Sequence, residues 1–203
     1  MTGWLVDCEE NRLISEVSIG INNPIWDHVG LDFNEAGDRL YVTNPEENEL
    51  VVFDTSTFTE LPPPISVGDH PFDVKAITIK TNLGTFEERL YVVNHGDAAV
   101  ANSDTMSIVD PTTGLVLVER PLNSDFNDSN HLGMTRIVGS LEVETLSPLV
   151  VRGENLYLTS PGRHEVFRYF VQNDGDLPTP LEQQGIQVFS TPGQVTVEHP
   201  ETP

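Results

Sequence analysis

Histidine and carboxylate side chains are the residues of this sequence whose types best suit chemistry. Imidazole and carboxylate groups contributed by separate segments can converge to bind a transition metal. No two of the histidines concerned have the i,i+2 or i,i+4 spacing of a dedicated metal site. The alternative is that polar loops are simply rich in His, Asp and Asn. The candidates for binding a ligand or partner are His70, His95, Asp97, Asp104, His131 and His164.

A second candidate site lies in the polar stretch 125–130, where oxygen-bearing side chains alternate with other residues. Asp125, Asn127 and Asp128 are the ligand types that Ca²⁺ prefers. The stretch lacks the central Gly and the final Glu of an EF-hand loop. The sequence therefore leaves two interpretations open, a divalent-cation site, with calcium as the cofactor, and a flexible polar insertion.

Other chemistries have little support in the sequence. There is no Gly-x-Ser-x-Gly elbow for a nucleophilic serine, and no Gly-rich motif that would cradle a phosphate. Cys8 is the single cysteine, which excludes an internal disulfide and a cysteine-rich zinc site. Nucleotide chemistry and nucleophilic catalysis are therefore not indicated.

The charge balance limits the partners. The chain carries 32 acidic and 10 basic residues, for a net charge of -22. A field of this sign repels phosphate backbones and anionic lipids, so neither nucleic acid nor a membrane is an expected partner. No apolar run has the length of a membrane span, since the longest have the length of a strand. Cations and basic proteins are favoured, unless the acidic side chains serve only to solvate the surface.

The elements that must position these residues are indicated by an internal repeat. The segment 39–44 (RLYVTN) returns as 89–94 (RLYVVN) and more loosely as 155–160 (NLYLTS). Each is rich in residues typical of β-strands. Each is followed by a polar loop and a second strand, at 49–54, 105–110 and 165–171.

Turn chemistry then predicts a hairpin. The first two of these second strands end in Asp, followed by Thr-Ser-Thr or Pro-Thr-Thr-Gly. Such residues favour a tight turn, because Asp accepts hydrogen bonds from nearby backbone N–H groups and Gly tolerates positive φ. The returning strands are expected at 58–67 and 115–122. Four antiparallel strands repeating every 40–55 residues are typical of a β-propeller blade.

These residues resemble a known family. Tyr41-Val42-Thr43-Asn44 matches the signature of YVTN-type β-propeller repeats, as do Asp38-Arg39 before it and the strand 51–54 (VVFD) after it. The resemblance covers most of the chain and weakens over 123–147 and after 175. It implies an all-β fold of four-stranded antiparallel blades. Because such repeats are commonest in exported proteins, it also implies a periplasmic, cell-surface or secreted location, although the first residues show no signal peptide.

Counting the repeats predicts an incomplete or half propeller of about three and a half blades, fewer than the four to eight that close a ring. A homodimer, or a longer chain or complex, is therefore expected. The units are 1–20 (outer strands of a partial blade), 21–68 (blade), 69–122 (blade), 123–147 (insertion), 148–190 (blade) and 191–203 (tail, a strand of a next blade).

Two functions remain open. In such blades, the loops between the second and third strands and the loops that lead into the next blade emerge on one face, where most candidate residues fall. The first hypothesis is a binding or assembly module that presents these loops to a protein or polymer partner. The second is a propeller enzyme or redox protein, a lactonase-like hydrolase or a metal- or cofactor-dependent reductase, with a His/Asp site on this face. The second rests on analogy between folds.

Overall fold

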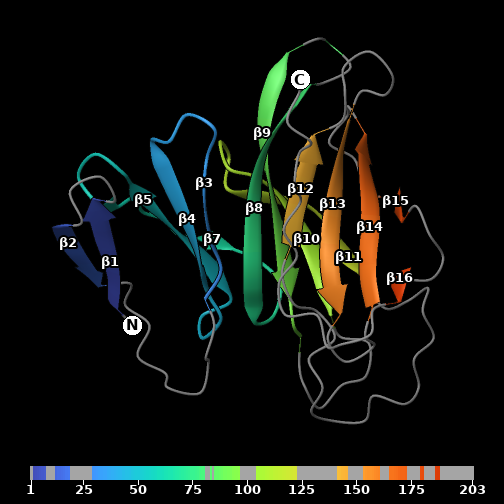
Figure 1. Ribbon diagram of the computed structural model, residues 1–203, viewed down its shortest axis with the longest axis horizontal. Helices are drawn as coiled ribbons and strands as arrows, with labels where there is room; N and C mark the ends of the chain where they lie inside the picture. Colours follow the sequence, from blue (N-terminus) through green and yellow to red (C-terminus); the bar gives the residue numbers. More distant parts are fainter. Residues whose placement is uncertain are drawn as a thin grey trace.

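The computed structural model (Figure 1) describes residues 29–96 except 81, 82 and 84, and residues 104–122. It also describes the strand backbones at 2–7, 12–18, 141–145, 153–160, 165–172, 179–180 and 186–187, with the side chains at 157–158 and 165–168. All regular structure in this part of the chain is β-strand. None of it is a helix long and apolar enough to cross a membrane.

The strands form three consecutive sheets and one isolated pair. The pair is β1 (Thr2–Asp7) and β2 (Arg12–Ser18). The first sheet contains β3 (Leu31–Phe33), β4 (Arg39–Asn44), β5 (Glu49–Asp54), β6 (Thr59–Glu60) and β7 (Ile65–Ser66). The second contains β8 (Pro71–Lys80), β9 (Phe86–Asn94), β10 (Thr105–Asp110) and β11 (Leu115–Pro121). The third contains β12 (Leu141–Thr145), β13 (Gly153–Ser160), β14 (Glu165–Gln172), β15 (Thr179–Pro180) and β16 (Ile186–Gln187).

Each sheet is antiparallel, and its first four strands pair in chain order; in the first and third sheets a fifth strand pairs with the third strand. The repeated tyrosines occupy the same place, since Tyr41, Tyr91 and Tyr157 all lie on the second strand of their sheets. This order is that of successive propeller blades. The predicted fold class, all-β with four-stranded antiparallel sheets, is confirmed.

The fourth strand of the first sheet differs from the prediction. A single returning strand was expected over 58–67, but β6 and β7 both pair with β5 and are separated by residues 61–64. Pro62, Pro63 and Pro64 fall in this gap. Proline has no backbone N–H to donate to a ladder, so the strand is interrupted there. The corresponding β11 has no proline before its last residue and runs unbroken.

The third sheet begins earlier than predicted. Its first strand, β12, lies inside the segment 123–147 that the sequence predicts as an insertion, and β12 pairs with β13 along its length. The unit expected at 148–190 therefore includes a strand that precedes residue 148. Leu141 and Val143 alternate with Glu142 and Glu144, which is the period of a half-buried strand. The tail 191–203 lies outside the described residues.

The sheets pack face to face. Tyr41, Leu50 and Val52 of the first sheet share one buried cluster with Val74 and Leu90 of the second. Tyr91 and Ile108, on the opposite face of the second sheet, share another with Leu158 and Phe167 of the third. In Figure 1 the sheets follow one another as an open array, with β1 and β2 at one end and β15 and β16 at the other. This stacking brings the strand ends of neighbouring sheets together.

Candidate functional site

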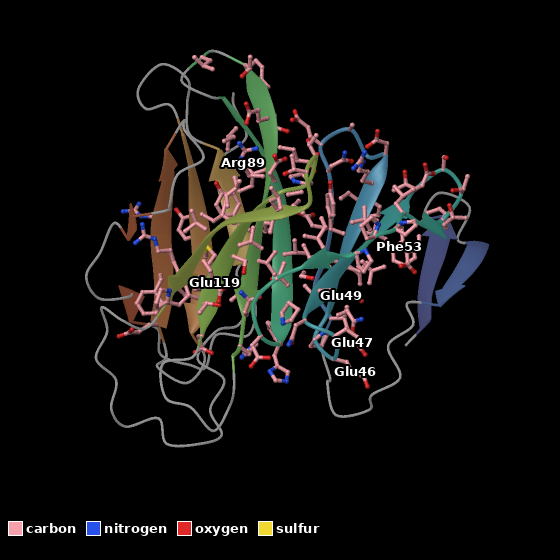
Figure 2. The ribbon with its side chains drawn as sticks, turned by 180° about the vertical axis from the view of Figure 1, so that it is seen from behind. Glu46, Glu47, Glu49, Phe53, Arg89 and Glu119 are labelled. Atoms are coloured by element: carbon pink, nitrogen blue, oxygen red, sulfur yellow. The ribbon has the colours of Figure 1, made fainter. Side chains whose placement is uncertain are left out.

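One end of the sheets gathers three loop segments from two successive units. They are the hairpin loop 45–48 between β4 and β5, the linker 67–70 between the first and second sheets, and residues 95–96 after β9. Glu46, Glu47 and Glu49 lie at this end, whereas Phe53 lies toward the other (Figure 2). We call this end the loop face. It is the face on which sequence analysis places the candidate residues.

Two of the candidate histidines connect segments of the loop face through backbone hydrogen bonds. The backbone N–H of His70 donates to Asn48 Oδ1 at 2.9 Å, and the N–H of His95 donates to the carbonyl of His70 at 2.9 Å. The N–H of Gly96 donates to the carbonyl of Asp69 at 3.0 Å. The hairpin loop of the first sheet is thus tied to two segments of the second unit.

The His70 ring adds to these contacts between loop segments. Its Nδ1 lies 3.0 Å from the carbonyl oxygen of Gly96 and 3.3 Å from Oδ1 of Asp69. Both neighbours can only accept a hydrogen bond, so Nδ1 must carry a proton here. The His95 and Phe72 rings pack edge to face, with centroids 4.2 Å apart and planes at 79°. Both rings therefore contribute to loop packing.

Asn94 makes a second set of contacts between segments, and sequence analysis did not single it out. It is completely buried, and its Nδ2 donates to Thr105 Oγ1 at 3.0 Å and to Ser107 Oγ at 2.9 Å. Ser107 Oγ also accepts the backbone N–H of Gly68 at 3.2 Å. The signal was present, since this asparagine is the last residue of the repeated motif. Its equivalent, Asn44, donates to Glu49 at the matching place in the first sheet.

Thr43 makes a third set of contacts between segments, and these contacts require glycine at position 30. The Gly30 N–H donates to Thr43 Oγ1 at 2.8 Å, and the Thr43 N–H donates to the Gly30 carbonyl at 3.0 Å. A Cβ atom at position 30 would lie 2.4 Å from the Cα atom of Asp73 and 2.7 Å from the carbonyl oxygen of Phe72. The chain just before β3 therefore lies directly against the start of β8.

The other end of the sheets holds ionisable groups in turns and in the core. The Ser56 hydroxyl and the Thr57 N–H donate to the Asp54 carboxylate and lower its pKa. Burial opposes ionisation of Asp110, but hydrogen bonds from the turn that follows it outweigh burial and lower its pKa. Burial and then the Glu88 carboxylate raise the pKa of Tyr41. Arg89 forms an ion pair with Glu87. These contacts hold turns and strands in place.

The described residues include only part of the predicted site. His70 and His95 are brought together, through their backbones. Asp104 is buried just before β10, where its carbonyl accepts the N–H of Leu122 at 2.9 Å. Among the described side chains, no three of His, Cys, Asp and Glu come together in a way that could hold a metal ion. Outside the described residues lie Asp97, His131, His164 and the predicted cation ligands Asp125, Asn127 and Asp128.

The chain is similar to known proteins in structure and not in sequence. No protein-family model matches the chain, and no curated protein matches it in sequence. It is similar in structure to hydrazine synthase from Kuenenia stuttgartiensis, with 14% identity, a TM-score of 0.38 and 88% of this chain covered. It is also similar to a putative 6-phosphogluconolactonase from Bacteroides uniformis ATCC 8492, with 10% identity, a TM-score of 0.37 and 91% covered. The match spans 60% and 64% of those two chains.

Proposed function

We propose that this protein is a binding or assembly module of the YVTN-type propeller class, and that its loop face docks a positively charged protein or polymer. The observation that carries the proposal is the hydrogen bonding between loops of two successive units. The described histidines on that face are held in loop-to-loop contacts through their backbones and rings. A docking platform requires such fixed loops, whereas a metal-dependent enzyme requires convergent side chains.

Fixed loops favour binding for an energetic reason. Association costs conformational entropy when loops must be ordered on contact, and loops that are already ordered avoid this cost. Asn48, His70 and Gly96 tie three segments together by hydrogen bonds of 2.9 to 3.0 Å. The loop face is therefore preorganised.

Exposed charge gives the partner its chemistry. Glu46 and Glu47 are exposed on the hairpin loop, and the Asp69 side chain is 48% exposed on the linker beside it. The whole chain carries a net charge of -22. Such a field accelerates encounter with a cationic partner and selects against anionic ones. A lysine- or arginine-rich segment is the partner chemistry that fits.

The location of this activity follows from the resemblance of the repeats. We propose a periplasmic, cell-surface or secreted setting, in which propeller loops meet proteins and polymers of the cell envelope. The enzyme alternative stays a prediction, because most of its candidate ligands lie outside the described residues. No contact among the described side chains favours it.

The proposal is tested by binding of a fluorescent octalysine peptide, measured by anisotropy at low and at physiological salt. The variant Glu46→Lys/Glu47→Lys reverses two charges on the loop face. The matched control, Glu35→Lys/Glu60→Lys, reverses two exposed charges near the opposite end of the same sheet. We expect the loop-face variant to lose at least about fivefold more affinity than the control, since short-range charge pairs outweigh the screened general field. Equal losses in the two variants would overturn the proposed docking face.

A further inference from the structure

The outer edges of the three sheets differ in how well they are protected. In the first sheet, the outer strand is split into β6 and β7, with Pro62, Pro63 and Pro64 between them. In the third sheet, β15 and β16 are short pieces of the same kind, and Pro180 ends β15. Short strands and prolines oppose the addition of a further strand, because few backbone groups remain to pair. Two of the three outer edges are therefore protected.

The outer strand of the second sheet is continuous. It is β11, which runs for 7 residues and, among the described strands, pairs with β10 alone. Its first four residues, 115–118, are Leu-Val-Leu-Val, with neither a charge nor a proline. The backbone groups of an edge strand that point away from its neighbour can pair with an incoming strand. Of the three outer edges, that of β11 offers the longest stretch for such pairing.

The side chains of β11 divide between two sides of the sheet. Val116 pairs with Val109 and packs against the cluster that the first and second sheets share. Leu115 and Leu117 flank Val116 and point to the opposite side, since side chains alternate along a strand. They are 61% and 47% exposed. Leu117 is the extra residue of a bulge and has no partner on β10. The edge of β11 is thus bordered by two exposed leucines.

The third sheet covers the inner part of this side and leaves its outer part open. Ile108 of β10 is buried against Leu158 and Phe167 of the third sheet. Between the first and second sheets the outer strands also meet, since β7 packs against β11. The corresponding pieces of the third sheet, β15 and β16, are only two residues long. Leu115 and Leu117 therefore remain exposed.

Acidic groups lie at both ends of this apolar stretch. Asp110 pairs with Leu115 at one end, and the exposed Glu119 follows at the other (Figure 2). The Asp110 carboxylate accepts hydrogen bonds from the turn after β10, which favour its ionised form. Arg120, the one basic residue of β11, lies beyond Glu119. A segment with a basic residue on each side of its apolar residues complements this pattern.

We propose that β11 receives an extended segment of a partner protein by strand addition. The segment pairs with the backbone of residues 115–118, places apolar side chains on Leu115 and Leu117, and carries a basic residue at each end. A second copy of this chain fits less well, because two chains with a net charge of -22 repel each other. The site is independent of the loop face and of the function proposed for it.

The test measures binding of a fluorescein-labelled peptide, Lys-Thr-Val-Thr-Val-Thr-Lys, by anisotropy at physiological salt. Leu115→Thr/Leu117→Thr, which keeps the strand propensity, should weaken binding at least about fivefold because apolar contact area is lost. Leu31→Thr/Phe33→Thr is the matched control at exposed apolar residues of β3 and should change the affinity by less than about twofold. Equal losses in the two variants would overturn the proposal.

A second peptide separates strand pairing from charge attraction. With proline in place of both valines, the peptide should bind the unmodified chain at least about tenfold more weakly, since proline cannot donate to a ladder. Equal affinities of the two peptides would show that the lysines alone account for binding, which contradicts strand addition. So would an unmodified chain that binds neither peptide at millimolar concentration.

Hydrogen exchange of the unmodified chain locates the peptide without relying on a variant. Saturating peptide should slow the outward-pointing amides within 115–118 at least about tenfold and leave the loop segments 45–48 and 67–70 unchanged. Protection of those loops in place of β11 rules out the strand site while leaving the proposed docking face intact. If the same amides of β11 are already as slow as those of β9 in the free chain, the edge is filled and the proposal is wrong. A dimer, seen by light scattering, that dissociates in Leu115→Thr/Leu117→Thr would make a second copy the occupant and overturn it as well.

Discussion

Val74 and Leu31 occupy the same place in successive sheets, yet one is completely buried and the other is 52% exposed. Both are apolar residues on the first strand, and each pairs with the valine that follows the repeated tyrosine. The difference comes from the preceding unit, since β3 and β4 cover β8 and no described inner strand covers β3. In repeat folds, burial depends on the neighbouring unit as much as on the residue itself.

The largest effect should distinguish these two positions directly. Val74→Asp should lower the free energy of unfolding by at least about 3 kcal/mol, because it buries an uncompensated charge. Leu31→Asp in the same chain should change it by less than about 0.5 kcal/mol. Urea unfolding followed by tryptophan fluorescence measures both. Similar losses at the two sites would mean that Leu31 is covered within one chain.

A second prediction concerns the close contact between the two sheets. Gly30→Ala should cost about 1–3 kcal/mol, because the new Cβ would meet the backbone of Asp73 and Phe72. Gly37→Ala is the control, since Gly37 has a φ of +69° and a Cβ added there would meet no atom within 4 Å, so only backbone strain of about 1 kcal/mol is expected. Thermal unfolding of both variants gives the comparison. A smaller loss for Gly30→Ala than for Gly37→Ala would contradict the packing described.

A third prediction compares the two Asp turns with the rest of the acidic surface. Hydrogen bonds to the ionised carboxylates hold the pKa values of Asp54 and Asp110 below the usual range. The stability that they contribute is present above about pH 4, the pKa of an unfolded Asp, and is lost as the pH falls through the folded pKa. Urea midpoints measured from about pH 5 to about pH 2 should therefore fall less in Asp54→Asn/Asp110→Asn than in the unmodified chain. Parallel pH profiles would argue against these turns as a source of acid sensitivity.

The smallest effect should come from screening of the net charge of -22. Like charges packed on one chain repel each other, and salt shortens the range of this repulsion to about 10 Å at 0.1 M. The melting temperature of the chain should rise by a few degrees from low to molar salt, as measured by calorimetry. A melting temperature that stays flat would show that the acidic side chains are too far apart to matter.

Much of the fold could be predicted because its signals are local. The strand from Arg39 to Asn44, the strand from Glu49 to Asp54 and the turn after Asp54 are each encoded within a few residues, and all three are found as expected. The split of the fourth strand at Pro62 to Pro64 had a local signal that was not used. The early start of the third sheet at Leu141 was not predicted, because this strand lies within a polar stretch.

The candidate site was harder to predict because its contacts join residues that are far apart in the sequence. His70 and His95 suggest ligands by their type, but their hydrogen bonds to Asn48 and Gly96 depend on how two sheets meet. The role of Asn94 likewise depends on Ser107 and Gly68. Such roles follow from tertiary packing, which spacing along one strand does not specify.

The most direct test of the open first strand is the rate at which a thiol reagent labels Leu31→Cys in a Cys8→Ser background. This thiol should react at least about tenfold faster than the thiol of Val74→Cys in the same background, because Leu31 is 52% exposed and Val74 is completely buried. Equally rapid labelling of Leu31→Cys and Val74→Cys would contradict the account.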